Sequence, residues 1–583
     1  MESRPSKVHR AAEGTESVPE ATQKRTPIVP GILLAGESLK GLVQEYPFKH
    51  WVLHDIWTEE FLKGCRTAIL AQDFNEKNND LYQFKQSNSL ASIQQAPLSD
   101  LRDTIYSTDF VAWMSTVTGI ALNSTVDISS AVYDDTSYLL CHDDDLSGRR
   151  VAFIIYMVPP VWSAAMGGTL DLYSAQEDGS PGAIVKSIVP RFNTMAFFEV
   201  SSRSFHQVAE VLASVAGGRA SISGWFHGDP LPPQEAPPVP APAPYMVPWH
   251  PDDALDSDSD SEGGGMCAED GAPLVLAAAA QGGGSQLLDN QLALWALQKA
   301  ASSLYTSLHL YTSPEDVWSH WISSTYTSRG RGILTQMAQA FNGNGFLQLP
   351  DFIAPGPLKQ LMKALPTQQW QHVGPAQLQH YRRSSSCSAA AQLSSPDGSP
   401  YDVQALGTAF SAVQQLELFL TSAAFLEFIQ AATGQTVRGV SVETRAFGHR
   451  DYSMICDPAY LAQRKASKAA SLGGSSSSAD AAAAGTGGVG DDAGVVLEVV
   501  LCLPLVAAST QSGSGACDGE WPLACGGYMT YLTVDEEVLT VPVSPNSLSI
   551  VAKPAGVFSF IKYVNHTAPG LRFDAMARFP VLD

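Results

Sequence analysis

A chain of 583 residues exceeds what one hydrophobic core can organise, so we expect two or more domains joined by linkers. A hydrophobic content of 45% with 16% charged residues excludes a chain that is disordered throughout, while 47 Gly and 37 Pro indicate flexible insertions. The formal net charge of -23 disfavours long contacts with nucleic-acid phosphates and favours encounter with a basic protein.

Secretion and membrane insertion are not expected. The eight cysteines include no CxxC pair, which argues against a disulfide framework or a thiolate zinc site. No apolar run approaches the roughly 20 residues that cross a bilayer, and the polar N-terminus lacks the apolar core of a signal peptide. We therefore expect a soluble protein of the cytoplasm, the nucleus or both.

The first domain is predicted at residues 28–228, after a polar, disordered leader at 1–27. Its early part looks helical, and from Thr125 onward short runs rich in β-branched and aromatic residues alternate with turn residues. This spacing favours an antiparallel sandwich or jelly roll, because parallel strands would need crossovers of a dozen or more residues. The predicted fold class is α+β, mainly β, with helices packed against a barrel.

The remainder of the chain divides by composition. A Pro-rich, acidic stretch at 229–285 cannot supply a core and predicts a linker. Apolar residues at helical spacing follow, so connecting helices are expected at 286–333. A second domain is expected at 334–583, with loop insertions near 384–399 and 465–492.

Three residues have the pattern of an iron site. His142 and Asp144 form a His-x-Asp pair, which a regular strand would place on one face, away from Asp143. His206, which lies 64 residues later in another β-like segment, would complete a facial triad of two imidazoles and one carboxylate, the set typical of Fe(II) oxygenases. Taken alone, His206 would by default be a core histidine.

Arg219 follows His206 by 13 positions and opens an apolar strand. An arginine placed there is suited to a bidentate, charge-assisted pair with a carboxylate, as 2-oxoglutarate would require. The alternative is a surface salt bridge. His227, at the end of the same strand, is left without a role.

The two halves of the chain repeat. Asn193 falls on Asn546 and Arg219 on Arg572 at a constant offset without gaps, so two copies of one fold are expected. The second copy replaces the three candidate ligands with Cys456, Pro458 and Ser559. In the same comparison Tyr133 falls on Phe447 and Tyr156 on Leu501. The second domain is therefore expected to support or recruit rather than to catalyse.

The segments YLLCHDDDLSGRRVAFIIYMVPP, MGGTLDLYS, FFEVSSRSFHQV and SISGWFHGDP resemble the 2-oxoglutarate oxygenases that hydroxylate prolines. The chain is similar to the ribosomal prolyl hydroxylase family, which includes the yeast termination-and-polyadenylation protein. The resemblance covers nearly the whole chain outside leader, linker and insertions. It implies a catalytic double-stranded β-helix followed by a second copy that has lost its metal site.

By position, the resemblance assigns Fe(II) to His142, Asp144 and His206, and the C5 carboxylate of 2-oxoglutarate to Arg219. It also implies that Tyr156 adds a phenol hydrogen bond and that Tyr133 lines the pocket. For both tyrosines, an aromatic ring that fills the barrel core is the alternative.

The resemblance implies a dioxygenase that converts 2-oxoglutarate and O2 to succinate and CO2, supported by ascorbate, while it hydroxylates a proline once or twice. The implied substrate is the small-subunit ribosomal protein of the decoding centre, with effects on translation accuracy and termination. Termination factors are further possible partners. The alternatives are a prolyl 4-hydroxylase that acts on a transcription factor in oxygen sensing, and a non-catalytic scaffold in translation termination or mRNA tail control.

Overall fold

The computed structural model describes residues 27–146, 148–229, 314–327, 331–384, 410–437, 440–456, 494–506 and 521–582. Most of the predicted leader, linker, connecting helices and loop insertions lies outside these ranges. The predicted domain boundaries therefore stay predictions. Pro458, the residue predicted opposite Asp144, also lies outside the described part of the chain.

The first half forms one antiparallel sheet of 11 strands in the order β1-β9-β6-β11-β4-β3-β5-β10-β7-β8, with β2 beside β3. The strands are β1 (His50–His54), β2 (Asn75–Asn78), β3 (Tyr82–Gln86), β4 (Val126–Tyr133), β5 (Tyr138–His142), β6 (Arg149–Tyr156), β7 (Leu170–Ala175), β8 (Pro181–Ile188), β9 (Thr194–Glu199), β10 (His206–Val208) and β11 (Arg219–His227). The helices are η1 (Ile32–Ala35), α1 (Gly36–Lys40), α2 (Glu59–Leu70), η2 (Leu90–Ser92), α3 (Leu98–Ile105), α4 (Thr108–Thr118) and η3 (Ala164–Met166).

This sheet curls over on itself. Strands from its two ends pack together in one buried cluster, which joins Tyr156 of β6 and Phe198 of β9 to Leu172 of β7. An antiparallel sheet whose ends meet in this way is the curled, jelly-roll arrangement. The prediction of a mainly β, antiparallel fold is confirmed.

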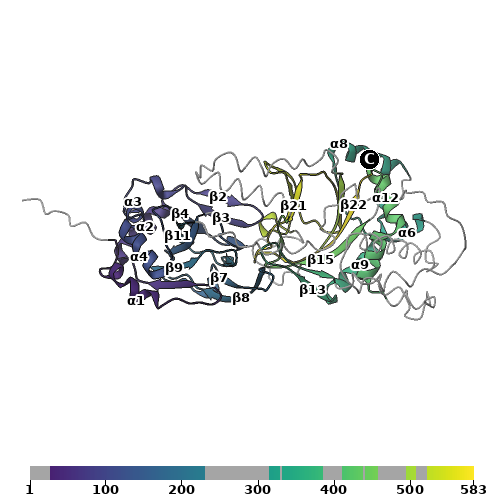
Figure 1. Cartoon of the computed structure of the whole chain (residues 1–583). Coiled ribbons are helices and arrows are strands. Elements are labelled where there is room, and N and C mark those ends of the chain that lie inside the picture. Colours follow the sequence, from purple (N-terminus) through teal and green to yellow (C-terminus); the bar gives the residue numbers. More distant parts are fainter. Residues whose placement is uncertain are drawn as a thin grey trace, which may run out of the picture.

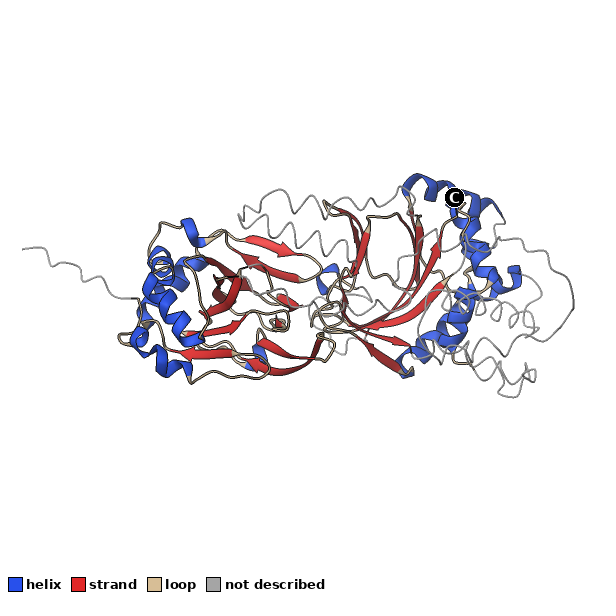
Figure 2. Cartoon of the chain, in the orientation of Figure 1, coloured by secondary structure: helices blue, strands red, loops and turns tan. Residues whose placement is uncertain are grey.

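The helices cover one end of the sheet, as Figures 1 and 2 show. In α2 the buried residues Leu62, Cys65 and Ile69 recur at helical spacing and face the core. Helix α4 begins at Ser107, whose hydroxyl accepts a hydrogen bond from the N–H of Phe110, and ends before Gly119. Local capping and one apolar face thus explain why these segments are helical beside a sheet.

The second half forms another antiparallel sheet of 11 strands, in the order β12-β20-β17-β22-β15-β14-β16-β21-β18-β19, with β13 beside β14. The strands are β12 (Phe346–Leu349), β13 (Trp370–Val373), β14 (Gln379–Ser384), β15 (Ser441–Phe447), β16 (Tyr452–Ser453), β17 (Val496–Val506), β18 (Met529–Leu532), β19 (Glu537–Val541), β20 (Ser547–Lys553), β21 (Phe558–Ile561) and β22 (Gly570–Pro580). The helices are α6 (Pro314–Trp321), α7 (Ser324–Thr327), α8 (Arg331–Asn344), α9 (Pro355–Ala364), η7 (Leu365–Thr367), α11 (Ala412–Thr421), α12 (Ala423–Thr433) and η10 (Leu523–Cys525).

The two sheets have the same sequential pattern of neighbours: each strand of the first has a counterpart at the same place in the second. The pairing registers agree as well. Arg219 lies opposite Tyr133 in the first sheet, and Arg572 lies opposite Phe447 in the second. The strand pairing therefore confirms that Arg219 corresponds to Arg572 and Tyr133 to Phe447.

One predicted correspondence is wrong by one residue. Tyr156 lies opposite Ser221, whereas the residue opposite Asp574, at the equivalent place of β22, is Cys502 rather than Leu501. Side chains alternate between the faces of a strand, so a shift by one residue exchanges the two faces. Around Tyr156 and Cys502 both strands are a run of apolar residues, so the sequence does not distinguish the registers.

The two sheets meet end to end, with their helices at the outer ends of the molecule (Figure 1). The apolar part of this contact is a shared cluster of residues from β5 and the β2–β3 turn of the first sheet and from β16 and its neighbours in the second: Leu81, Tyr138, Leu140, Tyr452, Met454 and Tyr563. Strand β5, which carries His142, is therefore packed directly against the second half of the chain.

Among the helices of the described residues, none is by itself long and apolar enough to cross a bilayer. Helices α11 and α12 reach that length and composition only together, and the pair is bent by 56° at its break.

Candidate metal centre and cosubstrate pocket

The three predicted ligands lie together where β5 and β10 pair. His142 ends β5 and is opposite His206, the first residue of β10. Asp144 lies beyond the end of β5 and faces the same point as His142, as predicted. Just after the strand, the carboxylate of Asp143 accepts a hydrogen bond from the N–H of Asp145 at 3.1 Å.

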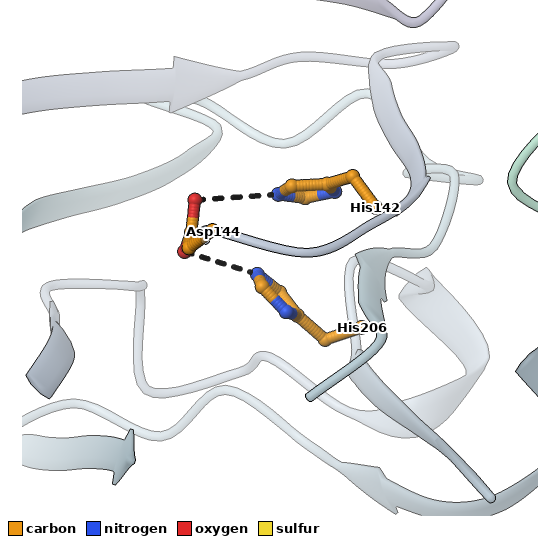
Figure 3. A group of neighbouring side chains, drawn as sticks. All are labelled: His142, Asp144 and His206. Carbon is orange, nitrogen blue, oxygen red and sulfur yellow. Dashed lines mark ion pairs between the residues drawn. The ribbon is translucent and has the colours of Figure 1, made fainter. Parts of the chain in front are cut away.

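The side chains converge on one point, as Figure 3 shows. The Asp144 carboxylate lies 3.9 Å from Nε2 of His142 and 3.4 Å from Nε2 of His206. One ligand atom from each of the three residues lies within 4.8 Å of the others, and no other such group of His, Cys, Asp or Glu occurs among the described residues. Two imidazoles and one carboxylate at this spacing form the facial set that suits Fe(II) and leaves positions open.

Both histidines are oriented by the main chain. Nδ1 of His142 lies 2.7 Å from the carbonyl oxygen of Leu140, and Nδ1 of His206 lies 2.9 Å from that of Ser204. When Nδ1 carries the proton and donates to a carbonyl, Nε2 presents its lone pair to the centre. These backbone contacts therefore favour the tautomer that a metal ligand needs.

The site is buried and strongly coupled. Burial alone would raise the pKa of Asp144, but its hydrogen bond and charge interaction with His206, together with His142 and Arg149, lower it well below its ordinary value. Burial would lower the pKa of His206, and Asp144 raises it instead. Asp144 therefore remains a carboxylate and can serve as the anionic ligand.

Arg149 is a residue that the sequence reasoning missed. It is buried at the start of β6, with its guanidinium 3.6 Å from the Asp144 carboxylate and 3.5 Å from the centroid of the Trp225 ring. Two of its nitrogens, Nε and Nη1, have no hydrogen-bond partner in the described part of the chain. The sequence signal that could have found Arg149 is its position as a charged residue at the start of a strand that is otherwise mostly apolar.

Arg219 opens β11 next to this centre and is only 1% exposed, which excludes the alternative of a surface salt bridge. Its Nε donates to the carbonyl oxygen of Gly168 at 2.6 Å. The guanidinium carbon lies 4.9 Å from the ring centroid of Tyr133 and 5.1 Å from that of Tyr156. The structure thus brings together the arginine and both tyrosines of the predicted pocket.

Two polar atoms of this pocket indicate whether a carboxylate of 2-oxoglutarate would fit there. Nη2 of Arg219 and the phenol oxygen of Tyr156 are buried and make no hydrogen bond within the described residues. Burial raises the pKa of Tyr156, and the nearby guanidinium only partly offsets this, so the phenol keeps its proton as a donor. A buried, unpaired guanidinium N–H beside an unpaired phenol is a matched pair of donors for one carboxylate, and the residues fit 2-oxoglutarate.

The other residues considered from the sequence have different surroundings. His227 contacts Asp127 across β11 and β4, with Nε2 3.0 Å from the carboxylate, so its ring is occupied by this contact. In the second half, Cys456 directs its thiol to the carbonyl oxygens of Leu378 and Met454. Ser559 donates to Glu498.

Two family models match the chain. Residues 128–227, which include the three candidate ligands and Arg219, match the 2OG-Fe(II) oxygenase superfamily. Residues 315–583 match the family described as "Oxoglutarate and iron-dependent oxygenase degradation C-term".

Curated relatives agree with the first match. The chain is 50% identical over 201 residues to prolyl 3-hydroxylase OGFOD1 of Xenopus laevis, an alignment that covers 34% of the chain and 39% of the relative. It is 49% identical over 198 residues to the Mus musculus protein of the same name, covering 33% of the chain and 36% of the relative.

Identity to prolyl 3,4-dihydroxylase OGFOD1 of Ostreococcus tauri is 37% over 198 residues, covering 31% of the chain and 38% of the relative. The alignments thus span less than two fifths of these relatives' own length. Taken with the site geometry, these matches show that residues 128–227 have the features of a 2OG-Fe(II) oxygenase domain, the kind of domain that uses Fe(II), 2-oxoglutarate and O2. Over 201 residues the chain is similar to an OGFOD1 prolyl hydroxylase.

Proposed function

We propose that the chain is a 2-oxoglutarate-dependent dioxygenase that hydroxylates a prolyl residue of a protein. The observation that carries this proposal is a cluster of His142, Asp144 and His206, of which the last two are buried, next to the unpaired donors of Arg219 and Tyr156. The relatives' names, prolyl 3-hydroxylase and prolyl 3,4-dihydroxylase, give the reaction and the substrate class.

In this reaction 2-oxoglutarate, O2 and a prolyl residue give succinate, CO2 and a hydroxyprolyl residue. Bound Fe(II) supplies the activation of O2. His142, Asp144 and His206 would hold the metal, and a set of three protein ligands leaves coordination positions for cosubstrates. Arg219 and Tyr156 would orient the distal carboxylate of 2-oxoglutarate, and the burial of these two residues, Asp144 and His206 limits the access of water to the centre.

We further propose that the second sheet is a degenerate copy of the catalytic one. The support is the same strand order in both sheets, the absence of the histidines at Cys456 and Ser559, and the state of Arg572. Arg572 is buried, and its Nη2 lies 2.6 Å from the carboxylate of Asp574. Its charge is already neutralised, so the second copy neither holds iron nor accepts a cosubstrate carboxylate.

For the substrate, we propose a proline of the small-subunit ribosomal protein at the decoding centre, with an effect on translation accuracy and termination. The net charge of -23 suits association with a basic ribosomal protein. Ascorbate is proposed as a supporting reductant, and termination factors as further partners. The mass of the product shows whether one or two hydroxyl groups are added.

The test is a binding experiment followed by product analysis. Anaerobic protein with Fe(II) and 2-oxoglutarate is expected to develop the visible charge-transfer band of the chelated cosubstrate, and Arg219→Ala should weaken it. Mass spectrometry of the candidate ribosomal protein after turnover should then show one or two added oxygens on proline. Absence of the band in the wild-type protein would refute the proposed function, whereas a band without modification would refute only the substrate.

A hydroxyl at C4 of the ring, the alternative of a prolyl 4-hydroxylase that acts on a transcription factor, would use the same site. The position of the hydroxyl is read from the NMR spectrum of the modified peptide. The non-catalytic scaffold predicts that His142→Ala changes no cellular phenotype, whereas the dioxygenase predicts that this variant abolishes succinate production.

A further inference from the structure

Glu210 is a buried acid that the proposed reaction does not use. It lies just after β10 and is 4% exposed. Three donors from the second half of the chain surround its carboxylate. Oε2 accepts from the Tyr563 phenol at 3.1 Å and lies 2.7 Å from Nε2 of His449, while Oε1 accepts from the backbone N–H of His566 at 2.9 Å.

These donors matter because a buried carboxylate is costly unless it is fully hydrogen-bonded. Each of the donors just named belongs to the second half of the chain, so the charge of Glu210 is satisfied by docking of the two halves. The position of Glu210 is therefore coupled to the interface between them.

The main chain of Glu210 continues this contact into the first sheet. Its carbonyl oxygen accepts a hydrogen bond from the N–H of Gly168 at 3.0 Å. The neighbouring Gly167 lies so close that a Cβ atom there would overlap the same carbonyl oxygen. Gly167 and Gly168 both have positive φ, of 68° and 67°, which a residue with a side chain rarely adopts. The two glycines are thus held against Glu210.

Gly168 in turn orients the cosubstrate arginine. Its carbonyl oxygen accepts from Nε of Arg219 at 2.6 Å, and a Cβ atom on Gly168 would lie 2.8 Å from Cδ of Arg219. One hydrogen bond thus joins Glu210 to Gly168, and a second joins Gly168 to Arg219. Nε of Arg219 is thus fixed by Gly168, whereas its Nη2 is without a hydrogen-bond partner in the described residues.

We propose that Glu210 is a positioning residue, through which Tyr563 and His449 of the second domain hold Gly168 and Arg219 in the geometry that binds 2-oxoglutarate. This inference rests on the proposed function, because it concerns the same pocket. It gives the second domain a role in catalysis without a metal site of its own. Glu210 touches neither iron nor cosubstrate in this role.

The chain offers a matched control in Asp135. Its carboxylate pairs with Nε2 of His566 at 2.9 Å and is thus another acid of the first half that contacts the second. Its side chain is 36% exposed, however, so loss of its charge leaves no buried ion unpaired. Asp135→Asn removes one charge at the interface while the contact between Glu210 and Gly168 is kept.

The experiment is calorimetric titration of 2-oxoglutarate into the full chain loaded with Mn(II), which fills the metal site without turnover. Glu210→Gln places an amide N–H against these donors, and Tyr563→Phe removes a single hydroxyl. Both are expected to weaken 2-oxoglutarate binding by about fivefold to tenfold, with Mn(II) affinity unchanged. Asp135→Asn should bind as the wild type does. The double variant Glu210→Gln with Tyr563→Phe should bind 2-oxoglutarate no more weakly than Glu210→Gln alone, because the Tyr563 hydroxyl acts through the Glu210 carboxylate.

With Fe(II), Tyr563→Phe should raise the KM for 2-oxoglutarate and leave kcat at saturation near that of the wild type. If Glu210→Gln fails to fold, the result for Tyr563→Phe decides whether the inference holds, because this variant keeps the buried aromatic ring. Wild-type affinity in Tyr563→Phe, or an equal loss in Asp135→Asn, would overturn the inference. A wild-type protein that binds no 2-oxoglutarate would overturn the proposed function and this inference with it.

Discussion

The two curled sheets differ most at the place where the first sheet has His206. There, His206 faces Asp144 and His142, and their charge and lone pairs are directed at one common point. The second sheet has Ser559 at the same place of the shared strand order, and it donates to Glu498 at 3.2 Å.

Glu498 also pairs with Lys553 and Arg578, each at 3.2 Å. The second site is therefore closed by internal ion pairs, whereas the first leaves its donors and ligands available.

The two arginines show the same contrast. Arg219 has an Nη2 without a partner among the described residues, while Arg572 is paired with Asp574, which lies at the position that corresponds to Ser221. Arg445 also pairs with Asp574, at 2.7 Å. One scaffold thus gives either a binding site or a structural ion-pair network, and the difference depends on whether its buried charges are satisfied within the chain.

The largest effect is expected from making the first site resemble the second. His206→Ser gives β10 the residue of β21 and removes a metal ligand, so it should abolish succinate production. The matched change in the second sheet, Ser559→Ala, should leave the rate of succinate formation unchanged. The assay is succinate release with saturating Fe(II) and 2-oxoglutarate. Equal losses in the two variants would contradict the assignment of chemistry to the first sheet.

Stability should show the opposite pattern. Asp574→Ser gives the second sheet the residue of the first and leaves Arg445 and Arg572 buried without their carboxylate. Breaking such a buried network costs about 3–5 kcal/mol, to be measured as the free energy of unfolding in urea. Ser221→Ala, at the equivalent place, should cost less than about 1 kcal/mol. A small effect of Asp574→Ser would mean that the network is not what stabilises the second sheet.

Acid should weaken the second sheet through Glu498. Burial would raise the pKa of this carboxyl, but Lys553 and Arg578 lower it to about 2, from an ordinary value of 4.5. The stabilisation is therefore present above pH 4.5 and is lost as the pH falls from there through about 2. It amounts to about 3 kcal/mol. Urea unfolding followed between pH 5 and 2 should show this loss in the wild-type chain and not in Glu498→Gln.

The smallest effect is expected at Tyr133. Tyr133→Phe gives the first pocket the residue Phe447 of the second, and it keeps the ring that contacts Arg219 and stacks on Phe84 at 4.7 Å. Binding of 2-oxoglutarate should change by less than about twofold. Tyr156→Phe removes an unpaired phenol and should weaken binding more. Calorimetry with Mn(II)-loaded protein compares the two, and a larger loss at Tyr133 would reverse the roles assigned to these tyrosines.

Much of the candidate site could be predicted from the sequence. His142, His206 and Arg219 lie on or at the ends of strands, where spacing and alternation are regular, and the structure brings all three together. The predicted ligand Asp144 joins them, but it lies beyond the end of β5, where the strand period that suggested it no longer applies.

The correspondence of Tyr156 with Leu501 was wrong because two runs of apolar residues offer no sequence signal that fixes their register. The ladder of backbone hydrogen bonds decided in favour of Cys502.

The sequence by itself determined the mainly β fold, the candidate ligand set and its replacement by Cys456 and Ser559 in the second half, because these depend on residue type and on periodicity along one chain. Only the tertiary structure decided what surrounds the buried charges. Arg149 beside Asp144, the unpaired nitrogen of Arg219 and the contact of Glu210 with Tyr563 join residues far apart in the chain. The cost of a buried charge depends on its neighbours in space, and these exist only once both sheets have folded and docked.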